Sequence, residues 1–252
     1  MNTAPEQPHD APPGFRIREA TLADVGGIID VWYASFNRTH RFFDYATPDT
    51  PATRKWFEAF WTMGIEAGPT VLRTFVVEDL DDNNTTAIDN DNNDKKEKEK
   101  GKKKIVAFSR WHVPQADGNQ DIPAPPFPDE WDPEISEALW GGMARSRERV
   151  MGKRPHWSAD FVAVHTDYQN RGLAVPLVEW ARRQAIASNV PMYADASMDG
   201  LPVWRHYGIV ECGLIEMPRR PETYGSYEVV PIYWEPGMSM GRRKGEGEVA
   251  RL

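Results

Sequence analysis

Apolar residues along this chain follow two periods, one typical of strands and one typical of helices. The segment 15–18 alternates aromatic or aliphatic residues with arginine, as a half-buried strand does. Directly after it, Val25, Ile29 and Trp32 recur at helical spacing. The same criteria predict strands over residues 15–18, 71–78, 105–111, 157–164, 192–196 and 227–234. They predict helices over residues 22–36, 52–65, 133–151, 173–187 and 201–207.

The order of these elements predicts one domain. Because strands and helices interleave, we expect a mixed α/β sheet with helices on both faces, spanning residues 15–236. The tails 1–14 and 237–252 are expected to be disordered. The low-complexity run 79–104 is acidic and Asn-rich, then Lys-rich, and lacks the apolar residues that order requires. We therefore interpret it as a disordered insertion between two neighbouring antiparallel strands.

Composition narrows the functional classes. The formal net charge of −8 argues against nucleic-acid binding, which needs a basic surface. Cys212 is the single cysteine, so no internal disulfide can form and a reducing compartment is expected. The N-terminus lacks a secretory pattern, and no segment approaches the ~18 apolar residues of a membrane span. These features predict a cytoplasmic or nuclear protein without a membrane partner; no metal is expected.

One turn has the residues of an anion site. A predicted strand ends at Val164, and a helix begins near Leu173. The free amides and the positive dipole end of such a helix attract phosphates. Gly172 lets the backbone approach a phosphate closely, and Arg171 can add charged hydrogen bonds. Neither a Walker sequence nor a GxGxxG fingerprint is present.

The segment Gln169-x-x-Gly172-x-Ala174 resembles the Q/R-x-x-G-x-G/A motif of the GNAT superfamily of N-acetyltransferases. The preceding strand, the YADAS segment from Tyr193 and the WRHYGI segment from Trp204 are similar to blocks that surround this motif in the family. The resemblance is strongest over residues 157–213. It points to the fungal-type branch, which includes puromycin acetyltransferase-like proteins.

The resemblance implies the GNAT fold, a twisted and mostly antiparallel sheet whose parallel fourth and fifth strands splay apart. Acetyl-CoA would lie between residues 157–164 and 192–196, with its pyrophosphate on the turn amides. No other cofactor is implied. The residues implied to hold the cofactor are Val162, Ala163, Val164, Gln169, Asn170, Arg171, Gly172, Leu173, Ala174, Ser197 and Trp204.

Acetyl transfer to an amine requires a group that removes the amine proton. Asp160 is the first candidate base; by the two-residue period of a strand it should share a face with Val162 and Val164. Asp195, on the facing strand, is the second candidate. His112 has a suitable pKa for a base but is more typical of a structural residue at a strand end.

The acid that protonates the leaving thiolate departs from the family pattern. Counting back from Gly208, Trp204 stands where the family usually has tyrosine, and an indole is no practical acid. Tyr207 lies three residues later on the same helical face and is the candidate substitute.

These features predict an N-acetyltransferase that acts on the primary amine of a small molecule, as a monomer or homodimer. Two alternatives stay open at this point. In the first alternative, the acceptor is a protein lysine or N-terminus. In the second, the chain is a catalytically silent acetyl-CoA-binding module.

Overall fold

The computed structural model describes residues 10–81, 103–118 and 124–238. In the predicted tails, residues 1–9 and 239–252 lie outside the described residues, as does most of the predicted insertion. One eight-stranded sheet forms the centre, in the order β1-β2-β3-β4-β5-β8-β6, with β7 also paired to β8. The strands are β1 (Phe15–Glu19), β2 (Leu72–Asp79), β3 (Ile105–His112), β4 (Trp157–Val164), β5 (Met192–Ser197), β6 (Val210–Glu211), β7 (Ile215–Glu216) and β8 (Glu228–Trp234).

All strand pairs are antiparallel except β4 and β5, so the sheet is mixed as predicted. The α-helices are α1 (Val25–Trp32), α2 (Arg41–Ala46), α3 (Pro51–Glu66), α5 (Pro133–Ser136), α6 (Gly142–Met151), α7 (Ala174–Ser188) and α8 (Leu201–Arg205). Short 3-10 and π turns adjoin them at Leu22–Asp24, Tyr33–Asn37, Glu137–Gly141 and Thr166–Tyr168. None of the helices in the described ranges is long and apolar enough to cross a membrane.

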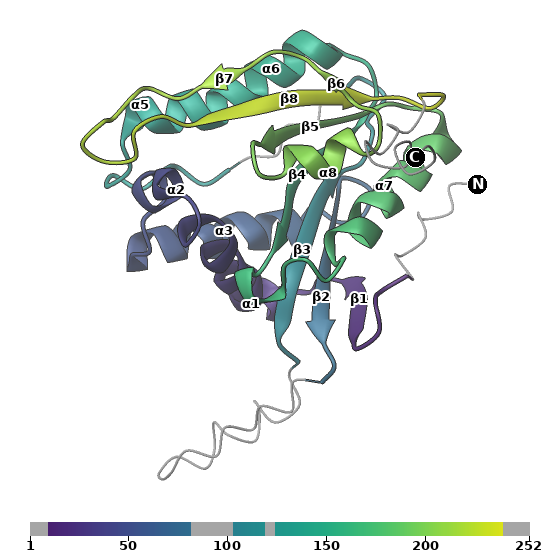
Figure 1. The fold of residues 1–252 in the computed structure, drawn as a ribbon, viewed down its shortest axis with the longest axis horizontal. Helices are drawn as coiled ribbons and strands as arrows, with labels where there is room; N and C mark the ends of the chain where they lie inside the picture. The colour runs from purple at the N-terminus through teal and green to yellow at the C-terminus, as the bar shows by residue number, and fades with distance from the viewer. Residues whose placement is uncertain (1–9, 82–102, 119–123, 239–252) are drawn as a thin grey trace, which may run out of the picture.

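Helices cover both faces of the sheet (Figure 1), and the buried side chains form two hydrophobic cores. On one face, α1, α2 and α3 bury aromatic side chains such as Trp32 and Trp61 against Phe108 of β3. On the other face, α7 and α8 cover Phe75 and Trp111. Successive strand residues point to opposite faces, so one strand contributes side chains to both cores.

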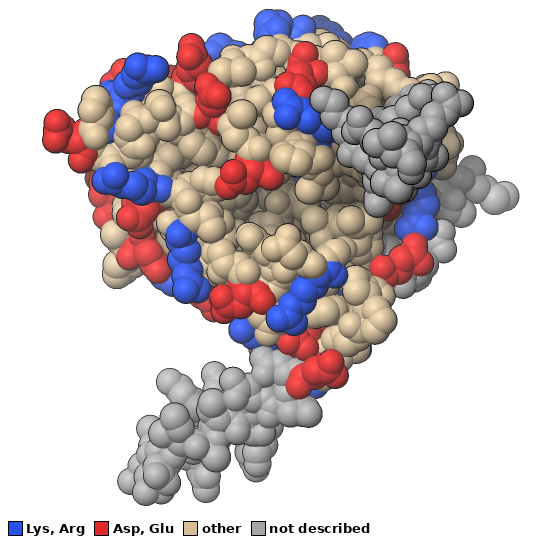
Figure 2. Space-filling view, viewed as in Figure 1, with Lys and Arg blue, Asp and Glu red and all other residues tan. Residues whose placement is uncertain are grey.

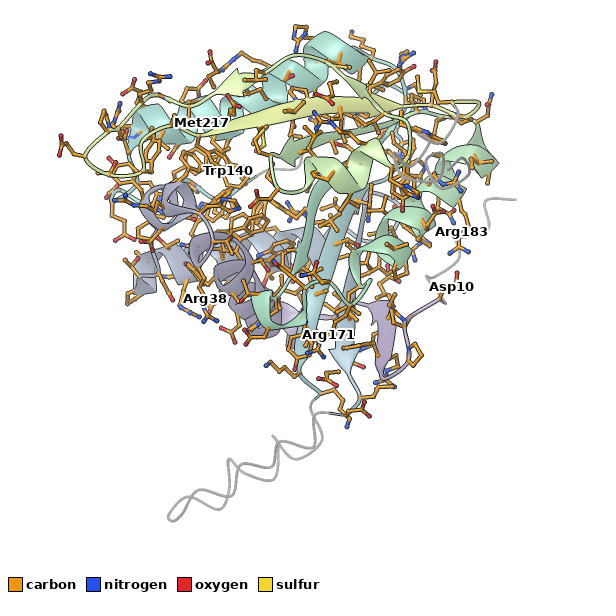
Figure 3. The ribbon with its side chains drawn as sticks, viewed as in Figure 1. Asp10, Arg38, Trp140, Arg171, Arg183 and Met217 are labelled. Carbon is orange, nitrogen blue, oxygen red and sulfur yellow. The ribbon has the colours of Figure 1, made fainter. Side chains whose placement is uncertain are left out.

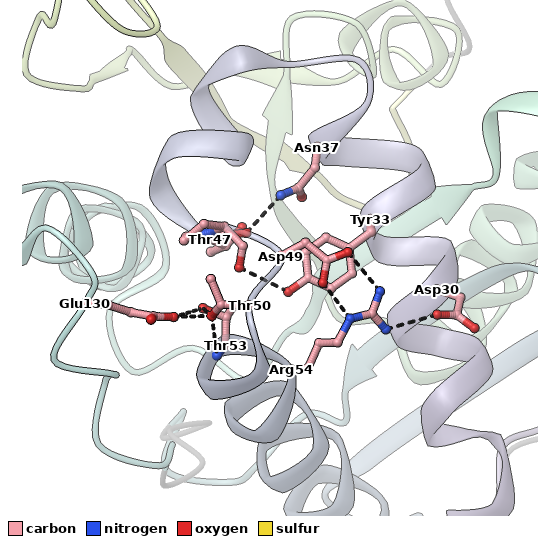
Figure 4. A network of polar contacts seen from close by, with 10 residues as sticks. Asp30, Tyr33, Asn37, Thr47, Asp49, Thr50, Thr53, Arg54 and Glu130 are labelled. Atoms are coloured by element: carbon pink, nitrogen blue, oxygen red, sulfur yellow. Dashed lines mark hydrogen bonds and ion pairs between the residues drawn. The ribbon is translucent and has the colours of Figure 1, made fainter.

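Helix α3 begins with a well-formed cap. The Thr50 hydroxyl accepts a 3.1 Å hydrogen bond from the Thr53 amide, and Pro51 suits the first helical turn. Glu130 accepts a 2.8 Å hydrogen bond from the Thr53 hydroxyl (Figure 4). The Trp56 indole donates to the Pro125 carbonyl at 3.0 Å. These contacts hold the Pro-rich segment 124–132 against α3.

The long periodic elements and the short β1 and α8 were predicted near their observed places, whereas α2, β6 and β7 were missed. Helix α2 has six residues, and β6 and β7 have two each. Strands of two residues exist only through pairing with β8, which local periodicity does not reveal. The N-terminal segment also makes a contact that the sequence did not predict, since Asp10 pairs with Arg183 of α7 at 2.9 Å (Figure 3).

Candidate functional site

Strands β4 and β5 pair for only three residues and then part. Their parallel register runs from Trp157 opposite Met192 to Ala159 opposite Ala194. Beyond this point β4 stays paired with β3 up to Val164, while β5 stays paired with β8. The facing edges of the two strands therefore leave a gap, with unpaired main-chain groups along β4.

The turn after β4 presents free amides next to this gap. Gly172 has φ +77°, Asn170 has φ +61°, and no atom lies within 4 Å of a Cβ built on Gly172. Within the described residues, the amides of 170–173 donate no hydrogen bond to a backbone carbonyl. Leu173, at the N-cap of α7, makes no side-chain cap. This helix start can therefore accept an anionic ligand.

A cavity of about 400 Å³, named here the cofactor cavity, joins the gap and the turn. Ten of the eleven residues implied by the resemblance line it, and Arg171 does not. The Arg171 guanidinium instead donates to the Asp167 carbonyl at 3.2 Å and lies 4.8 Å from the centre of the Tyr168 ring (Figure 3). The surface is hollowed between α8 and the N-terminal helices, and mainly uncharged residues border the hollow (Figure 2).

Two smaller cavities continue from the cofactor cavity through the sheet gap. The junction cavity, about 100 Å³, shares Val162, Ser197 and Trp204 with the cofactor cavity. The acceptor cavity, about 190 Å³, shares Asp160, Phe161, Asp195, Ala159, Trp140 and Met143 with the junction cavity. Adjacent cavities thus link the turn after β4 to both predicted carboxylates.

Asp160 is held by two cationic or proton-donating partners. Its Oδ2 accepts from Arg110 Nε at 2.7 Å, and its Oδ1 lies 2.7 Å from His112 Nε2. Burial opposes ionisation, but His112 and Arg110 outweigh it and hold the pKa of Asp160 well below its usual range. A carboxylate with both oxygens engaged and a low pKa is a poor proton acceptor, which argues against the role of base.

The expected orientation of Asp160 was wrong, because β4 has a bulge. Arg110 pairs with Phe161 and Trp111 pairs with Ala159, so Asp160 has no partner on β3. The extra residue re-aims its side chain. Asp160 therefore bonds Arg110, whose guanidinium carbon lies 5.4 Å from the Phe161 ring centre, while Val162 packs against the opposite core.

Asp195 has the opposite electrostatic setting. Burial raises its pKa to about 7; the Asp160 charge adds to this rise, whereas Tyr193 and Arg147 oppose it. The Tyr193 hydroxyl donates to Asp195 Oδ1 at 2.8 Å. Two carboxyls that share a cavity and have pKa values displaced in opposite directions commonly divide acid–base roles. Asp195 has the pKa of a base that works near neutral pH.

Tyr207 does not line the three cavities. It is 4% exposed within the second core, and burial raises its pKa to about 12. Trp204 does line the cofactor and junction cavities. The candidate acid Tyr207 therefore lies away from the cavities that Trp204 lines, because the helical turn that carries both residues directs Tyr207 into the packed interior.

Tyr227 is a cavity residue that the sequence reasoning missed. It lines the junction cavity, yet it lies far along the chain from the GNAT-like motif. No spacing rule connects the two. His165 supports the turn after β4, since its Nδ1 accepts a hydrogen bond from the Asp167 amide at 3.2 Å. Among the described residues, no group of three or more His, Cys, Asp or Glu could hold a metal ion.

No family model and no curated protein matches this sequence. Solved structures are similar to it. A candidate acetyltransferase from Acinetobacter baylyi has a TM-score of 0.50 at 14% identity, over 89% of this chain and 94% of that chain. A protein from Corynebacterium glutamicum, named for histone acetyltransferase HPA2 and related acetyltransferase, has a TM-score of 0.49 at 17% identity, with 90% and 98% covered. A GCN5-related N-acetyltransferase from Kribbella flavida has a TM-score of 0.47 at 15% identity, with 90% and 100% covered. At this level of identity the likeness concerns the fold alone: this chain is folded like the candidate acetyltransferase from Acinetobacter baylyi.

Proposed function

We propose that this protein transfers the acetyl group of acetyl-CoA to the primary amine of a small molecule. One observation carries the proposal: the gap between β4 and β5 opens beside an uncapped turn and leads through adjoining cavities to Asp195. Kinship with the puromycin acetyltransferase-like branch belongs to the same proposal and rests on the quoted motifs alone.

The coenzyme is held mainly by backbone groups. The amides from Asn170 to Ala174 bind the pyrophosphate, where the α7 dipole also favours negative charge. The pantetheine follows the unpaired edge of β4 from Val162 to Val164. A strand amide at this edge polarises the thioester carbonyl and stabilises the oxyanion of the tetrahedral intermediate. The fit is supported by the open space above Gly172.

Asp195 takes the proton of the attacking amine. It lines both the junction and the acceptor cavities, so it borders the space where amine and thioester meet. Asp160 keeps its negative charge through Arg110 and His112 and acts as a fixed neighbour of Asp195. This arrangement favours a base that is half ionised near pH 7, close to the most effective pKa for proton transfer there.

The acceptor cavity favours an amine with a flat apolar body. Phe60, Trp140 and Phe161 line it with ring centres 6.2 Å apart in each pair. Aromatic walls of this kind pack well against flat apolar groups. Both oxygens of Asp160 are engaged, and Arg147 adds a cation to the lining. A second ammonium group on the acceptor would therefore find no free oxygen on Asp160.

Thiol release from acetyl-CoA tests the proposal with phenethylamine, 1,4-diaminobutane and a lysine-containing peptide as acceptors. We expect kcat/KM for phenethylamine to exceed the other two by about tenfold or more, since apolar packing distinguishes substrates on this scale. Trp140→Ala should remove the preference. Phe127→Leu is the matched control, because Phe127 stacks near Trp140 but does not line the cavity. A higher kcat/KM for the peptide than for the two small amines would identify a protein acceptor.

The second candidate function is a silent acetyl-CoA-binding module. Trp204 favours this function, because it lines the cofactor cavity where the family usually has tyrosine, and an indole is no practical acid. Tight binding of acetyl-CoA without thiol release for any amine would establish this function. Absence of any acetyl-CoA binding would refute both.

A further inference from the structure

We propose that the junction cavity is an acyl pocket that accepts acyl groups longer than acetyl, up to about four carbons. Propionyl-CoA and butyryl-CoA are therefore donors alongside acetyl-CoA. This inference rests on the proposed function, because it places the thioester where the cofactor cavity meets the junction cavity. It deepens that function by naming the class of acyl donor.

The junction cavity continues the path of the coenzyme. The residues that it shares with the cofactor cavity are Phe36, Val162, Ser197, Gly200 and Trp204. The pantetheine on the β4 edge therefore delivers its thioester to this shared boundary. Asp195 lines the junction and acceptor cavities but not the cofactor cavity, so the reacting carbon lies on the junction side. The acyl chain on that carbon has the rest of the junction cavity around it.

The walls that belong to the junction cavity alone suit a hydrocarbon chain. The residues that neither neighbouring cavity shares carry no charge, and they include Trp32, Phe43, Leu139 and Val229. None of these four residues is more than 6% exposed. The two carboxyl groups stand instead on the part of the lining that the acceptor cavity shares. The amine thus meets the carboxyl groups, and the acyl chain meets the apolar wall.

The junction cavity is larger than the methyl group of acetyl requires. Its volume is about 100 Å³. In another protein, an apolar cavity of about 150 Å³ stays dry and binds benzene, a six-carbon ring. By proportion, the junction cavity holds about four carbons. Close packing is the rule inside proteins, so an acyl chain that fills this space is favoured over one that leaves it empty.

Aromatic walls limit the length of the chain. The ring centres of Trp32, Phe36 and Phe43 lie 4.6 to 5.9 Å from one another. Phe36 belongs to the π turn Tyr33–Asn37, and Leu139 belongs to the π turn Glu137–Gly141. Such turns are rare and occur frequently at functional sites. Packed rings resist displacement, so a hexanoyl chain exceeds the pocket.

The reaction balances for each of these donors. The amine nitrogen attacks the thioester carbon, the C–S bond breaks, and an amide of the longer acid forms. Asp195 takes one proton from nitrogen and passes it to solvent, while the thiolate takes one proton from solvent and becomes the coenzyme A thiol. The acyl chain moves unchanged from sulfur to nitrogen.

Binding of a donor series tests the pocket without any amine. We titrate the full-length protein with acetyl-, propionyl-, butyryl- and hexanoyl-CoA by calorimetry. The Kd should fall by about fourfold with each added methylene up to butyryl-CoA, because each methylene is buried, and it should rise again for hexanoyl-CoA. An affinity that is independent of chain length, or highest for acetyl-CoA, would overturn the acyl pocket and leave the proposed function standing. Failure of all four donors to bind would refute the proposed function as well.

Substitutions of one residue should move the preferred chain length in both directions. Leu139→Phe fills the pocket and should shift the tightest binding to acetyl-CoA, whereas Leu139→Ala extends the pocket and should shift it to hexanoyl-CoA. A general loss of folding cannot produce opposite shifts. Ile135→Ala is the matched control, because Ile135 is 1% exposed in the same core and does not line the three cavities. It should keep the wild-type order of donors. The wild-type order in both Leu139 variants would overturn the proposal.

Discussion

The hydroxyl of Tyr193 donates a 2.8 Å hydrogen bond to Oδ1 of Asp195, two residues further along β5. A strand places alternate side chains on one face, so the side chains of these two residues lie next to each other. The bond stabilises the ionised carboxylate and partly offsets the burial that raises the pKa of Asp195. It also leaves Oδ2 of Asp195 for an incoming amine.

Tyr193→Phe should move the pH dependence of acetyl transfer upward. Loss of the hydrogen bond removes stabilisation of the ionised base, so the pKa of Asp195 rises above about 7. In a profile of log kcat/KM, the break that belongs to the enzyme should move to higher pH by about one unit. The acceptor amine titrates separately and gives the same second break in both proteins. An unmoved enzyme break would exclude Asp195 as the base.

Asp160→Asn should move the same break in the opposite direction. The ionised Asp160 disfavours a second negative charge on Asp195, so its removal lowers the pKa of Asp195. Asn can still accept a hydrogen bond from Arg110, which limits the loss of folding stability. The profiles of Tyr193→Phe and Asp160→Asn, measured with one amine, should lie on either side of the wild type. Two shifts in one direction would contradict the arrangement of charges.

Asp195→Asn should stabilise the fold at pH 8 while it abolishes most activity. The folded protein binds the Asp195 proton more tightly than the unfolded chain, since the pKa rises from 3.8 to about 7. The stabilising contribution is therefore complete below pH 3.8 and is lost as the pH rises towards about 7. Tm should exceed that of the wild type at pH 8, and the difference should disappear near pH 4. A lower Tm at pH 8 would mean that Asp195 is ionised and well paired.

Gly172→Glu should weaken acetyl-CoA binding by about tenfold or more, because a carboxylate would stand beside the phosphates. Gly68→Glu is the matched control: Gly68 has φ +81° and, like Gly172, no atom within 4 Å of a built Cβ. Both variants carry the same backbone strain and the same added charge. Calorimetry with acetyl-CoA should show the loss for Gly172→Glu alone. Equal affinities in the two variants would remove the turn from the cofactor site.

Local patterns were sufficient for the main elements and for the turn between β4 and α7. β2 and β3 are buried on both faces and stand out as short runs rich in apolar residues, whereas α7 stands out by its helical period. Both signals are visible in a window of a few residues. The turn around Gly172 is also local, because its free amides and its positive φ depend on a short run of residues. That is why the motif and the helix start near Leu173 coincide in the structure.

The roles of individual side chains were decided by contacts between distant segments. A bulge opposite β3 turned Asp160 towards Arg110, and packing under α7 removed Tyr207 from the cavities. The pKa of Asp195 depends on burial and on charges from other elements, and Tyr227 reaches the junction cavity only because β8 lies beside β5. Electric fields and burial act through space, so a linear pattern records the residues but not their surroundings.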